Sequence, residues 1–234
     1  MPVRVSCPHC RMPCLVAEQH LGVPVKCGRC GRTFTTRGDP KATMRLEAAA
    51  PPARLDIGAA TAPKRGRERK EDRFLVQHLI RCNLEERHEL AVLVVADGSR
   101  VIPAAAAALA PLFGNFLNGA SNDVVSAAET LAAACKTVDS TVALAVIWNG
   151  QGAIGGVGDC PIYHQSGGRM TRPKRGPLKL AAGDWLVLAC DFPLDEAALQ
   201  TEIAAARSSA SELAQLLVER SGRDNGTVVV VRGY

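Results

Sequence analysis

The stretch Leu90-Ala-Val-Leu-Val-Val-Ala-Asp97-Gly98 is a continuous apolar run that ends in an acid and a glycine. An unbroken apolar run of this length, bounded by a turn signal, predicts a β-strand. Two other apolar runs stand beside an acid in the same way: Trp185–Cys190 precedes Asp191, and Asp224-Asn225 precedes residues 227–232. We therefore expect carboxylates at several strand ends.

The acids at these strand ends are candidate ligands for a hard divalent cation. Mg²⁺ and Mn²⁺ prefer oxygen ligands, and a site for two ions needs several carboxylates that converge. Glu71-Asp72, which stands before an apolar run, belongs with them, so the candidates are Glu71, Asp72, Asp97, Asp191 and Asp224. Any one of them alone could instead terminate a strand, as Asp often does next to Gly or Asn.

The remaining pattern predicts the order of strands and helices. Strands are expected at residues 74–82, 90–96, 141–148, 152–157, 162–165, 185–190 and 227–232, and helices at residues 103–117, 123–136, 194–206 and 208–220. Strands and helices that alternate in blocks are typical of two antiparallel sheets packed face to face with helices outside. The predicted fold class is α+β, a compact four-layer αββα sandwich. Gly150-x-Gly152-x-x-Gly155 matches a dinucleotide fingerprint, but a strand follows it where that motif needs a helix, so it predicts a hairpin turn.

Five short pieces of sequence occur in a fixed order along the chain. They are Arg67-x-x-x-Glu71-Asp72, Val95-Ala96-Asp97-Gly98, Gly158-Asp159-Cys160, Leu188-Ala189-Cys190-Asp191 and Asp224-Asn225-x-Thr227. In this order they resemble the metal-dependent serine/threonine phosphatases of the protein phosphatase 2C (PPM) family. The resemblance covers residues 64–234. It implies the αββα fold and an enzyme that hydrolyses phosphoserine and phosphothreonine in proteins.

The resemblance also implies which residues bind Mn²⁺ or Mg²⁺. Asp97 would bridge two ions, with the Gly98 carbonyl as a further ligand. The other ligands that it implies are Asp191 and Asp224 on one ion, and Glu71 and Asp72 on the other, partly through water. Asp159 would join Asp191 at a third, weaker ion.

The chemistry of phosphate esters fits this assignment. Two cations neutralise a phosphate dianion and supply hydroxide near neutral pH, so that no serine or cysteine nucleophile is needed. Arg67 falls where the family keeps a phosphate-binding arginine, whose planar fork binds two phosphate oxygens. Candidates for proton donation are His78, His88 and His164, each of which is more simply explained as a strand or turn residue. A basic loop that could attract a phosphorylated substrate, or be merely solvated, contains Arg172, Lys174 and Arg175.

Three departures from the family pattern keep a second function open. The family continues the second motif as Asp-Gly-x-Gly-Gly, but here it reads Asp97-Gly98-Ser99-Arg100-Val101, and Phe192 follows Asp191 where the family has glycine. Residues 170–180 are also too short to contain the family's flap segment. The alternative is a pseudo-phosphatase that binds phosphoproteins or regulates a kinase without hydrolysis. A third alternative, a nucleic-acid-binding ribbon on an inert scaffold, has little support.

The N-terminal cysteines predict a separate metal site. Two Cys-x-x-Cys pairs are separated by 16 residues and are formed by Cys7, Cys10, Cys27 and Cys30. Four thiolates complete a tetrahedral shell around one structural Zn²⁺, and a ribbon of residues 1–36 is too small to fold on apolar burial alone. Two matched pairs favour zinc over a redox pair. His9 and Cys14 are alternative ligands, or a turn residue and a spare thiol.

Composition places the ribbon, a linker and one main domain in a single soluble chain. Of 234 residues 47% are apolar, and the net charge of +5 belongs to the ribbon and to residues 37–63, which we expect to form a flexible linker. The sequence shows neither a membrane-spanning run nor a signal peptide, and its cysteines are scattered, so we expect a cytoplasmic protein. With Phe34 as its one aromatic residue, the ribbon is better suited to protein docking than to nucleic acid.

Overall fold

The computed structural model describes residues 2–10, 13–17, 20, 22–35, 54–62, 72–82, 86–98, 100–119, 123–136, 140–190, 195–205, 209–221 and 226–234. The chain divides into two compact units, Met1–Ala50 and Pro51–Tyr234. Within the described ranges, no helix combines the length and the apolar character that crossing a membrane requires.

The smaller unit contains two pairs of short antiparallel strands. β1 (Pro2–Ser6) pairs with β2 (Pro13–Ala17), and β3 (Pro24–Lys26) pairs with β4 (Thr33–Thr35). Among its described residues, Cys7, Cys27 and Phe34 form a buried cluster, and Val16 is also buried. So few buried side chains remove too little apolar surface from water to hold a fold together, which is the situation in which a metal supplies the missing stability.

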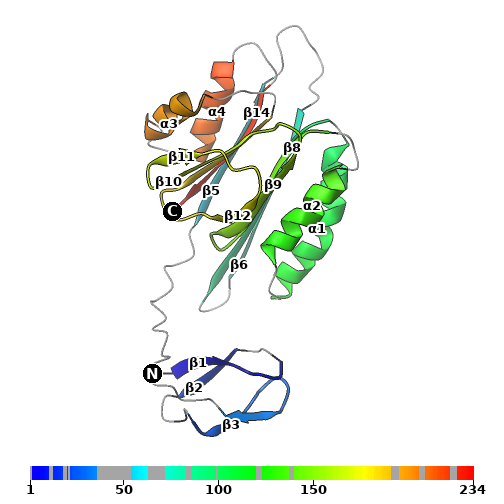
Figure 1. Ribbon diagram of the computed structural model, residues 1–234, viewed down its shortest axis with the longest axis vertical. Helices are drawn as coiled ribbons and strands as arrows, with labels where there is room; N and C mark the ends of the chain where they lie inside the picture. The colour runs from blue at the N-terminus through cyan, green and yellow to red at the C-terminus, as the bar shows by residue number, and fades with distance from the viewer. Residues whose placement is uncertain are drawn as a thin grey trace. The chain divides into compact units, whose positions relative to one another are not determined.

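The larger unit is built around two five-stranded antiparallel sheets (Figure 1). The first has the order β12-β9-β8-β7-β6 and the second has the order β11-β10-β13-β14-β5. The strands of the first are β6 (Asp72–Cys82), β7 (Arg87–Asp97), β8 (Val142–Trp148), β9 (Gln151–Val157) and β12 (Gly176–Lys179). Those of the second are β5 (Leu55–Ala62), β10 (Ile162–Ser166), β11 (Arg169–Thr171), β13 (Trp185–Cys190) and β14 (Gly226–Gly233).

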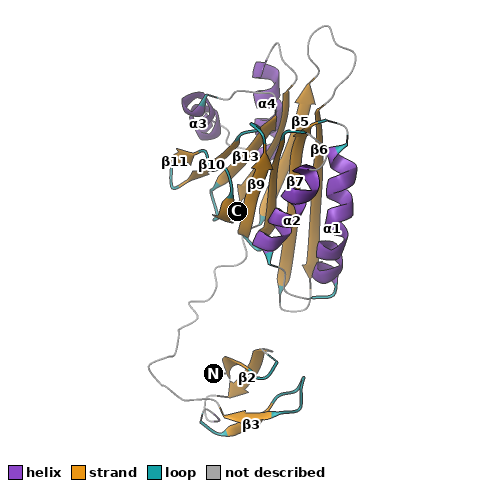
Figure 2. Ribbon diagram, turned by 45° about the vertical axis from the view of Figure 1, so that its right-hand side comes forward, coloured by secondary structure: helices purple, strands orange, loops and turns teal. Residues whose placement is uncertain are grey.

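Helices cover the outer faces of the sheets, so that the unit has four layers (Figure 2). α1 (Val101–Leu117) and α2 (Val124–Lys136) pack on the first sheet, and α3 (Glu196–Ala205) and α4 (Ala210–Ser221) pack on the second. A further apolar cluster lies between the two sheets. The predicted αββα sandwich is confirmed.

β7 lies inside the first sheet, which explains its unbroken apolar sequence. Its even-numbered residues from Leu90 to Ala96 face the helices, while Ala91, Leu93 and Val95 face the second sheet. Every residue from Leu90 to Ala96 is 0% exposed. A strand that is covered on both faces loses the usual alternation of apolar and polar residues. Asp97, the last residue of β7, is therefore carried on a rigid element.

β5 corrects one expectation, because Leu55–Ala62 was predicted to belong to the linker. Its small residues suggested a tether, but they serve close packing against α4. A Cβ atom on Gly58 would lie 2.3 Å from the backbone nitrogen of Ser211, so only glycine allows the helix to approach this closely. The Asp56 carboxylate also accepts a hydrogen bond from the Ala210 N–H at 2.6 Å, which caps α4.

The turn between β8 and β9 confirms the hairpin that was predicted for the glycine-rich segment. Trp148 pairs with Gln151, which leaves Asn149 and Gly150 as a two-residue loop. Both have positive φ angles, 49° and 75°, as the favoured hairpin turn requires. Asn followed by Gly is the usual sequence for that turn.

Candidate metal centres

Two of the predicted carboxylates face each other across one strand pair. The register of β6 and β7 places Asp72, the first residue of β6, directly opposite Asp97, the last residue of β7. Directly opposed residues of an antiparallel pair project from the same face of the sheet. Asp72 is only 4% exposed, and Asp97 is half-buried. Two acids held together in this way form a natural pair of ligands for a hard cation.

The second sheet meets these acids through a threonine. The Thr227 hydroxyl, at the start of β14, donates to Asp72 Oδ2 at 3.5 Å. Thr61 near the end of β5 lies beside it, with the two hydroxyl oxygens 2.9 Å apart. Since Thr227 has one hydroxyl hydrogen, Thr61 donates to Thr227 and the pair forms a short relay to Asp72. Both sheets therefore contribute to this end of the sandwich.

A second threonine, Thr141, contacts residues at the ends of three other segments: Asp97, Cys160 and Cys190. The Asp97 N–H donates to the Thr141 carbonyl at 3.1 Å, and the Thr141 hydroxyl accepts from Cys160 Sγ at 3.3 Å. Cys190 Sγ, at the end of β13, lies 3.8 Å from the same hydroxyl oxygen. Asp159 precedes Cys160 and is exposed in the turn after β9. We call the region of Asp72, Asp97, Thr141, Asp159 and Thr227 the carboxylate end.

The structure describes four of the eight residues predicted for the Mn²⁺ or Mg²⁺ site and the phosphate. Asp72, Asp97, Gly98 and Asp159 lie at the carboxylate end, while Arg67, Glu71, Asp191 and Asp224 lie outside the described residues. Gly98 has a φ angle of 115°, and a Cβ atom there would lie 2.5 Å from Ser140 Oγ, so this position requires glycine. The three threonines Thr61, Thr141 and Thr227 were not predicted as site residues, although Thr227 stands in the quoted Asp224-Asn225-x-Thr227 motif.

A cleft of about 550 Å³ opens beside Asp159. Its lining includes Gly158, Asp159 and Cys160 together with the basic residues Arg172, Lys174 and Arg175, which we call its cationic wall. These cations belong to the segment that joins β11 to β12, and its shortness agrees with the predicted lack of a flap. The cleft therefore combines an acid at the carboxylate end with a cationic wall, which suits an anionic ligand.

The three histidines that were weighed as proton donors lie elsewhere. His78 and His88 are near the end of the first sheet opposite to Asp97, and His164 lies beside Asp184, with Nε2 and Oδ2 3.8 Å apart. Burial lowers the pKa of His164, and Asp184 opposes that effect only in part. None of the three is placed to donate a proton at the carboxylate end.

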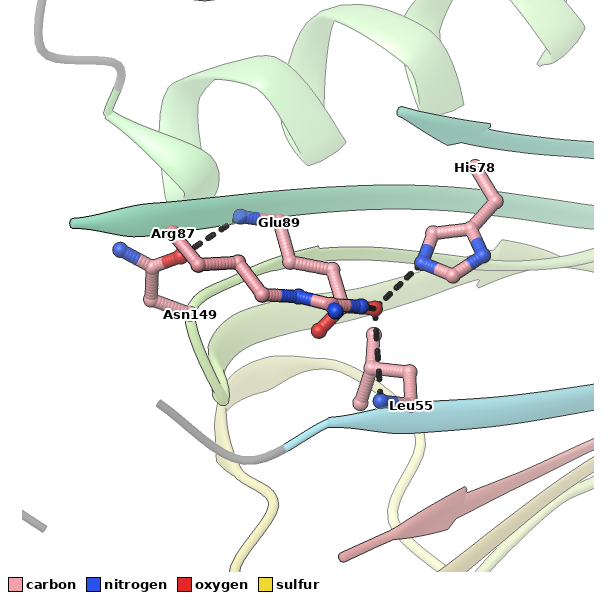
Figure 3. Close-up of polar contacts among 5 residues, drawn as sticks. All are labelled: Leu55, His78, Arg87, Glu89 and Asn149. Atoms are coloured by element: carbon pink, nitrogen blue, oxygen red, sulfur yellow. Dashed lines mark hydrogen bonds and ion pairs between the residues drawn. The ribbon is translucent and has the colours of Figure 1, made fainter. Parts of the chain in front are cut away.

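At the opposite end, Glu89 forms a satisfied buried cluster (Figure 3). Its Oε1 is 2.6 Å from His78 Nε2 and 3.4 Å from both Arg87 Nη2 and the Leu55 nitrogen. Its backbone N–H donates to Asn149 Oδ1 at 2.8 Å. Burial opposes ionisation of Glu89, but His78, the Leu55 N–H and Arg87 outweigh it and hold the pKa of Glu89 below its ordinary value.

The smaller unit holds a different candidate site. The sulfur atoms of Cys7, Cys10, Cys27 and Cys30 all lie within 4.8 Å of one another. The distance is 3.8 Å between Cys7 and Cys30, and 3.6 Å between Cys10 and Cys27. Four sulfurs at about 2.3 Å from one tetrahedral ion would be roughly 3.8 Å apart. The donor set and its spacing fit Zn²⁺.

The two alternative ligands differ from these four cysteines. His9 is exposed and does not belong to the four-residue cluster. Cys14 Sγ lies 4.0 Å from Cys27 Sγ, and burial together with Cys27 raises its pKa. In contrast, backbone hydrogen bonds from Cys30 and Arg29 lower the pKa of Cys27 to about 6. The thiolate form that a metal needs is therefore favoured at Cys27 and disfavoured at Cys14.

Known proteins resemble this chain in structure. No family model and no curated protein sequence matches it. Its fold is similar to the phosphatase domain of SpoIIE from Bacillus subtilis, described as a PP2C phosphatase domain with a regulatory fragment, at a TM-score of 0.56 and 20% identity over 77% of this chain. It is also similar to the catalytic domain of the phosphatase PstP in complex with two manganese ions (TM-score 0.56, 18% identity, 76% of this chain and 98% of that chain). RsbX in complex with magnesium gives a TM-score of 0.52 at 16% identity over 77% of this chain and 96% of that chain.

The larger unit has the PP2C phosphatase fold. The match covers 63% of the length of the SpoIIE fragment, which includes a regulatory segment, and nearly all of the PstP domain. Two sheets with helices outside place the carboxylate end where several strands of a PP2C fold begin or end. Identities of 16–20% establish the architecture alone.

Proposed function

We propose that the larger unit is a Mn²⁺- or Mg²⁺-dependent phosphoprotein phosphatase that hydrolyses phosphoserine and phosphothreonine. The observation that carries the proposal is the opposition of Asp72 and Asp97 in a PP2C fold. Two acids held face to face repel each other unless a cation lies between them or one of them is protonated. Carboxylate oxygens are also the donors that Mn²⁺ and Mg²⁺ prefer, so the residues present fit the metals that the fold implies.

The division of roles follows the family pattern. Asp97 and the Gly98 carbonyl would hold two ions, the remaining ligands would be Glu71, Asp72, Asp191 and Asp224, and Asp159 would belong to a third ion. When bound, the ions activate water and neutralise the phosphate. Thr227 orients the Asp72 carboxylate by its hydrogen bond, and Arg67 holds two phosphate oxygens. The cationic wall of the cleft draws the phosphorylated segment toward Asp159.

The smaller unit is proposed to be a zinc ribbon that docks a protein partner, either the phosphoprotein substrate or a cognate kinase. Four sulfurs at tetrahedral spacing leave no open position on the ion, so this zinc is structural. We expect Cys27→Ser to abolish zinc retention and Cys14→Ser to preserve it, as measured by elemental analysis of the purified chain. Equal zinc loss in both variants would contradict the four-cysteine assignment. The cytoplasm is the proposed compartment, on the basis of the scattered single cysteines.

The activity is tested by incubating the full chain with a phosphothreonine peptide and Mn²⁺ and measuring released phosphate. We expect turnover that is lost in EDTA and in Asp191→Ala, and retained in Glu86→Gln, which changes an exposed acid outside the site. Turnover that survives EDTA would contradict a metal-dependent mechanism. Zinc in the ribbon is monitored in the same samples to separate the two metal sites.

One observation favours the alternative of a pseudo-phosphatase. Arg100 stands at the N-terminus of α1, two residues after Gly98, so its charge and the positive end of the helix follow directly on the proposed metal ligands. A cation there opposes metal binding and favours an anion that stays bound. A chain that binds a phosphothreonine peptide without releasing phosphate, and that begins to hydrolyse it after Arg100→Gly, would establish this second function.

A further inference from the structure

Two cysteines at the carboxylate end stand opposite each other on neighbouring strands. The pairing of β10 with β13 places Ile162 opposite Leu188, and the Ala189 N–H donates to the Pro161 carbonyl at 3.0 Å. Continued two residues beyond the Ile162–Leu188 pair, the same register places Cys160 opposite Cys190. The chain therefore brings together two thiols that are 30 residues apart in sequence.

The hydrogen bond between Ala189 and Pro161 also fixes the kind of pair that the cysteines form. Antiparallel strands alternate between hydrogen-bonded and non-hydrogen-bonded pairs. Ala189 and Pro161 are a hydrogen-bonded pair, so Cys160 and Cys190 are a non-hydrogen-bonded pair. The Cα atoms of such a pair lie about 4.5 Å apart, which is inside the roughly 4.4–6.8 Å that a disulfide spans.

Both thiols are directed at the same atom. Cys160 Sγ lies 3.3 Å and Cys190 Sγ lies 3.8 Å from the hydroxyl oxygen of Thr141, which directly precedes β8 of the other sheet. Both side chains also pack against the apolar cluster between the sheets. The two sulfur atoms therefore project from one face of their sheet, as a disulfide between opposed residues requires.

The two cysteines differ in their access to solvent. Cys190 is 0% exposed, whereas Cys160 is half-buried and lines the cleft of about 550 Å³ beside Asp159. A small oxidant that enters the cleft reaches Cys160 first. Cys190 then stands behind it as a resolving thiol that the oxidant itself does not reach.

We propose that Cys160 and Cys190 form a reversible disulfide when the protein meets hydrogen peroxide. Cys160 Sγ attacks one peroxide oxygen, the O–O bond breaks, and the departing hydroxide takes the thiol proton and leaves as water. Cys190 Sγ then attacks Cys160 Sγ, the new S–O bond breaks, and this hydroxide takes the Cys190 proton. Two thiols and one hydrogen peroxide thus give one disulfide and two waters.

The effect on hydrolysis rests on the proposed function. Cys160 follows Asp159 and Cys190 precedes Asp191, so the bond ties together the backbone beside two proposed metal ligands. The bond also removes the contacts that both sulfurs make with the Thr141 hydroxyl. The backbone carbonyl of the same threonine accepts the hydrogen bond from the Asp97 N–H. We expect the oxidised protein to lose most of its Mn²⁺-dependent hydrolysis and to recover it after reduction with dithiothreitol.

The disulfide can be detected without any activity. The zinc-loaded full chain is treated with hydrogen peroxide, remaining thiols are alkylated, and the tryptic peptides are identified by mass spectrometry. Trypsin releases residues 137–169, with Cys160 as their one cysteine, and residues 180–207, with Cys190 as their one cysteine. We expect these two peptides to be linked after oxidation and separate after dithiothreitol.

Matched variants decide the outcome. Cys160→Ser and Cys190→Ala each abolish the linked peptide, and in Cys190→Ala we expect Cys160 to proceed to sulfinic acid. Cys82→Ser, which changes an exposed cysteine on the first sheet, leaves the linked peptide unchanged. Recovery of Cys160 and Cys190 on separate alkylated or over-oxidised peptides would overturn the proposal. If the linked peptide forms in a chain whose reduced form is inactive, the disulfide is upheld and the proposed phosphatase activity is contradicted. If the linked peptide forms and turnover is undiminished, the proposed regulatory effect of the disulfide is overturned.

Discussion

The strand pair β6–β7 carries acids at both ends, and the groups that surround these acids differ between the two ends. Asp97 and Glu89 lie on the same face of β7, toward the second sheet, eight residues or about 27 Å apart. Glu89 is met by His78, Arg87 and a backbone N–H, so protein groups neutralise and bond its carboxylate (Figure 3). Asp97 faces Asp72, another acid.

We infer from this contrast that Glu89 is a structural acid and that Asp97 belongs to the proposed metal site. A buried carboxylate that is matched by cations of the protein stabilises the fold and is the usual solution. A pair of opposed carboxylates costs stability unless something outside the chain completes it. Changes at the Glu89 end should therefore affect unfolding, and changes at the carboxylate end should affect metal binding and turnover.

Asp97→Asn is expected to have the largest effect. Metal ions contribute several kcal/mol to transition states of this kind, and a loss of about 4 kcal/mol corresponds to a roughly 1000-fold fall in kcat/KM. In EDTA the variant should melt at the same temperature as the parent or higher, because Asp72 no longer faces a like charge. Phosphate release measures the expected fall in kcat/KM, and thermal melting in EDTA measures the expected change in stability. A variant that melts lower in EDTA would show that Asp97 is a structural acid like Glu89.

Glu89→Gln should reverse this pattern. Removing one partner of a buried charged cluster costs about 3 kcal/mol, or roughly 6–12 °C in melting temperature for a unit of this size. The kcat of the folded protein should be unchanged. Because the folded-state pKa of Glu89 is lowered, its stabilisation is present above its ordinary value of 4.5 and lost as the pH falls through the folded value.

The gap in melting temperature between the parent and Glu89→Gln should accordingly narrow below about pH 4.5. Melting curves at a series of pH values measure it, with Glu86→Gln, an exposed acid near the same end, as the matched control. A gap that stays constant as the pH falls would show that the ionised form of Glu89 contributes nothing.

Thr227→Val tests whether the hydroxyl relay orients Asp72. Valine keeps the shape of the side chain and removes the hydrogen bond to Asp72 Oδ2. Loss of a group that orients a ligand typically weakens metal affinity about 10-fold or more. Calorimetric titration with Mn²⁺ measures the change, and Thr130→Val, which alters an exposed hydroxyl on α2, is the control. Unchanged affinity would remove Thr227 from the site.

The basic wall of the cleft should have the smallest effect. Replacing Lys174 and Arg175 by serine removes two exposed cations, which act mainly by attracting the substrate. We expect KM for an acidic phosphopeptide to rise about 3-fold at low salt with kcat unchanged, and the difference to shrink as salt screens the charges. A fall in kcat would instead give the loop a role in the chemistry.

The sequence predicted the architecture because its signals were strong and local. Unbroken apolar runs marked the buried strands, and Asp97 could be placed at the end of one from its neighbours alone. β5 was missed because its Gly58 and Ala residues reflect the close approach of α4, a contact between segments far apart in the chain. The four ribbon cysteines could be predicted because two Cys-x-x-Cys pairs are a local sequence signal for a tetrahedral metal site.

The parts of the site that were missed depend on register. Thr61, Thr141 and Thr227 are ordinary residues in or beside strands until the pairing of the strands is known. The same holds for Cys160 and Cys190, which become neighbours only through the alignment of β10 with β13. A shift of that alignment by a single residue would direct the two side chains to opposite faces.

Diffraction from crystals of the full chain grown with Mn²⁺, with anomalous data collected at the manganese edge, tests the central claim most directly. Our account predicts anomalous peaks at about 2.1 Å from a carboxylate oxygen of Asp97 and beside the carboxylate of Asp72, directly or through one water, and none near Glu89. Crystals that diffract well and contain manganese elsewhere, or not at all, while Asp72 and Asp97 keep their opposition, would contradict it.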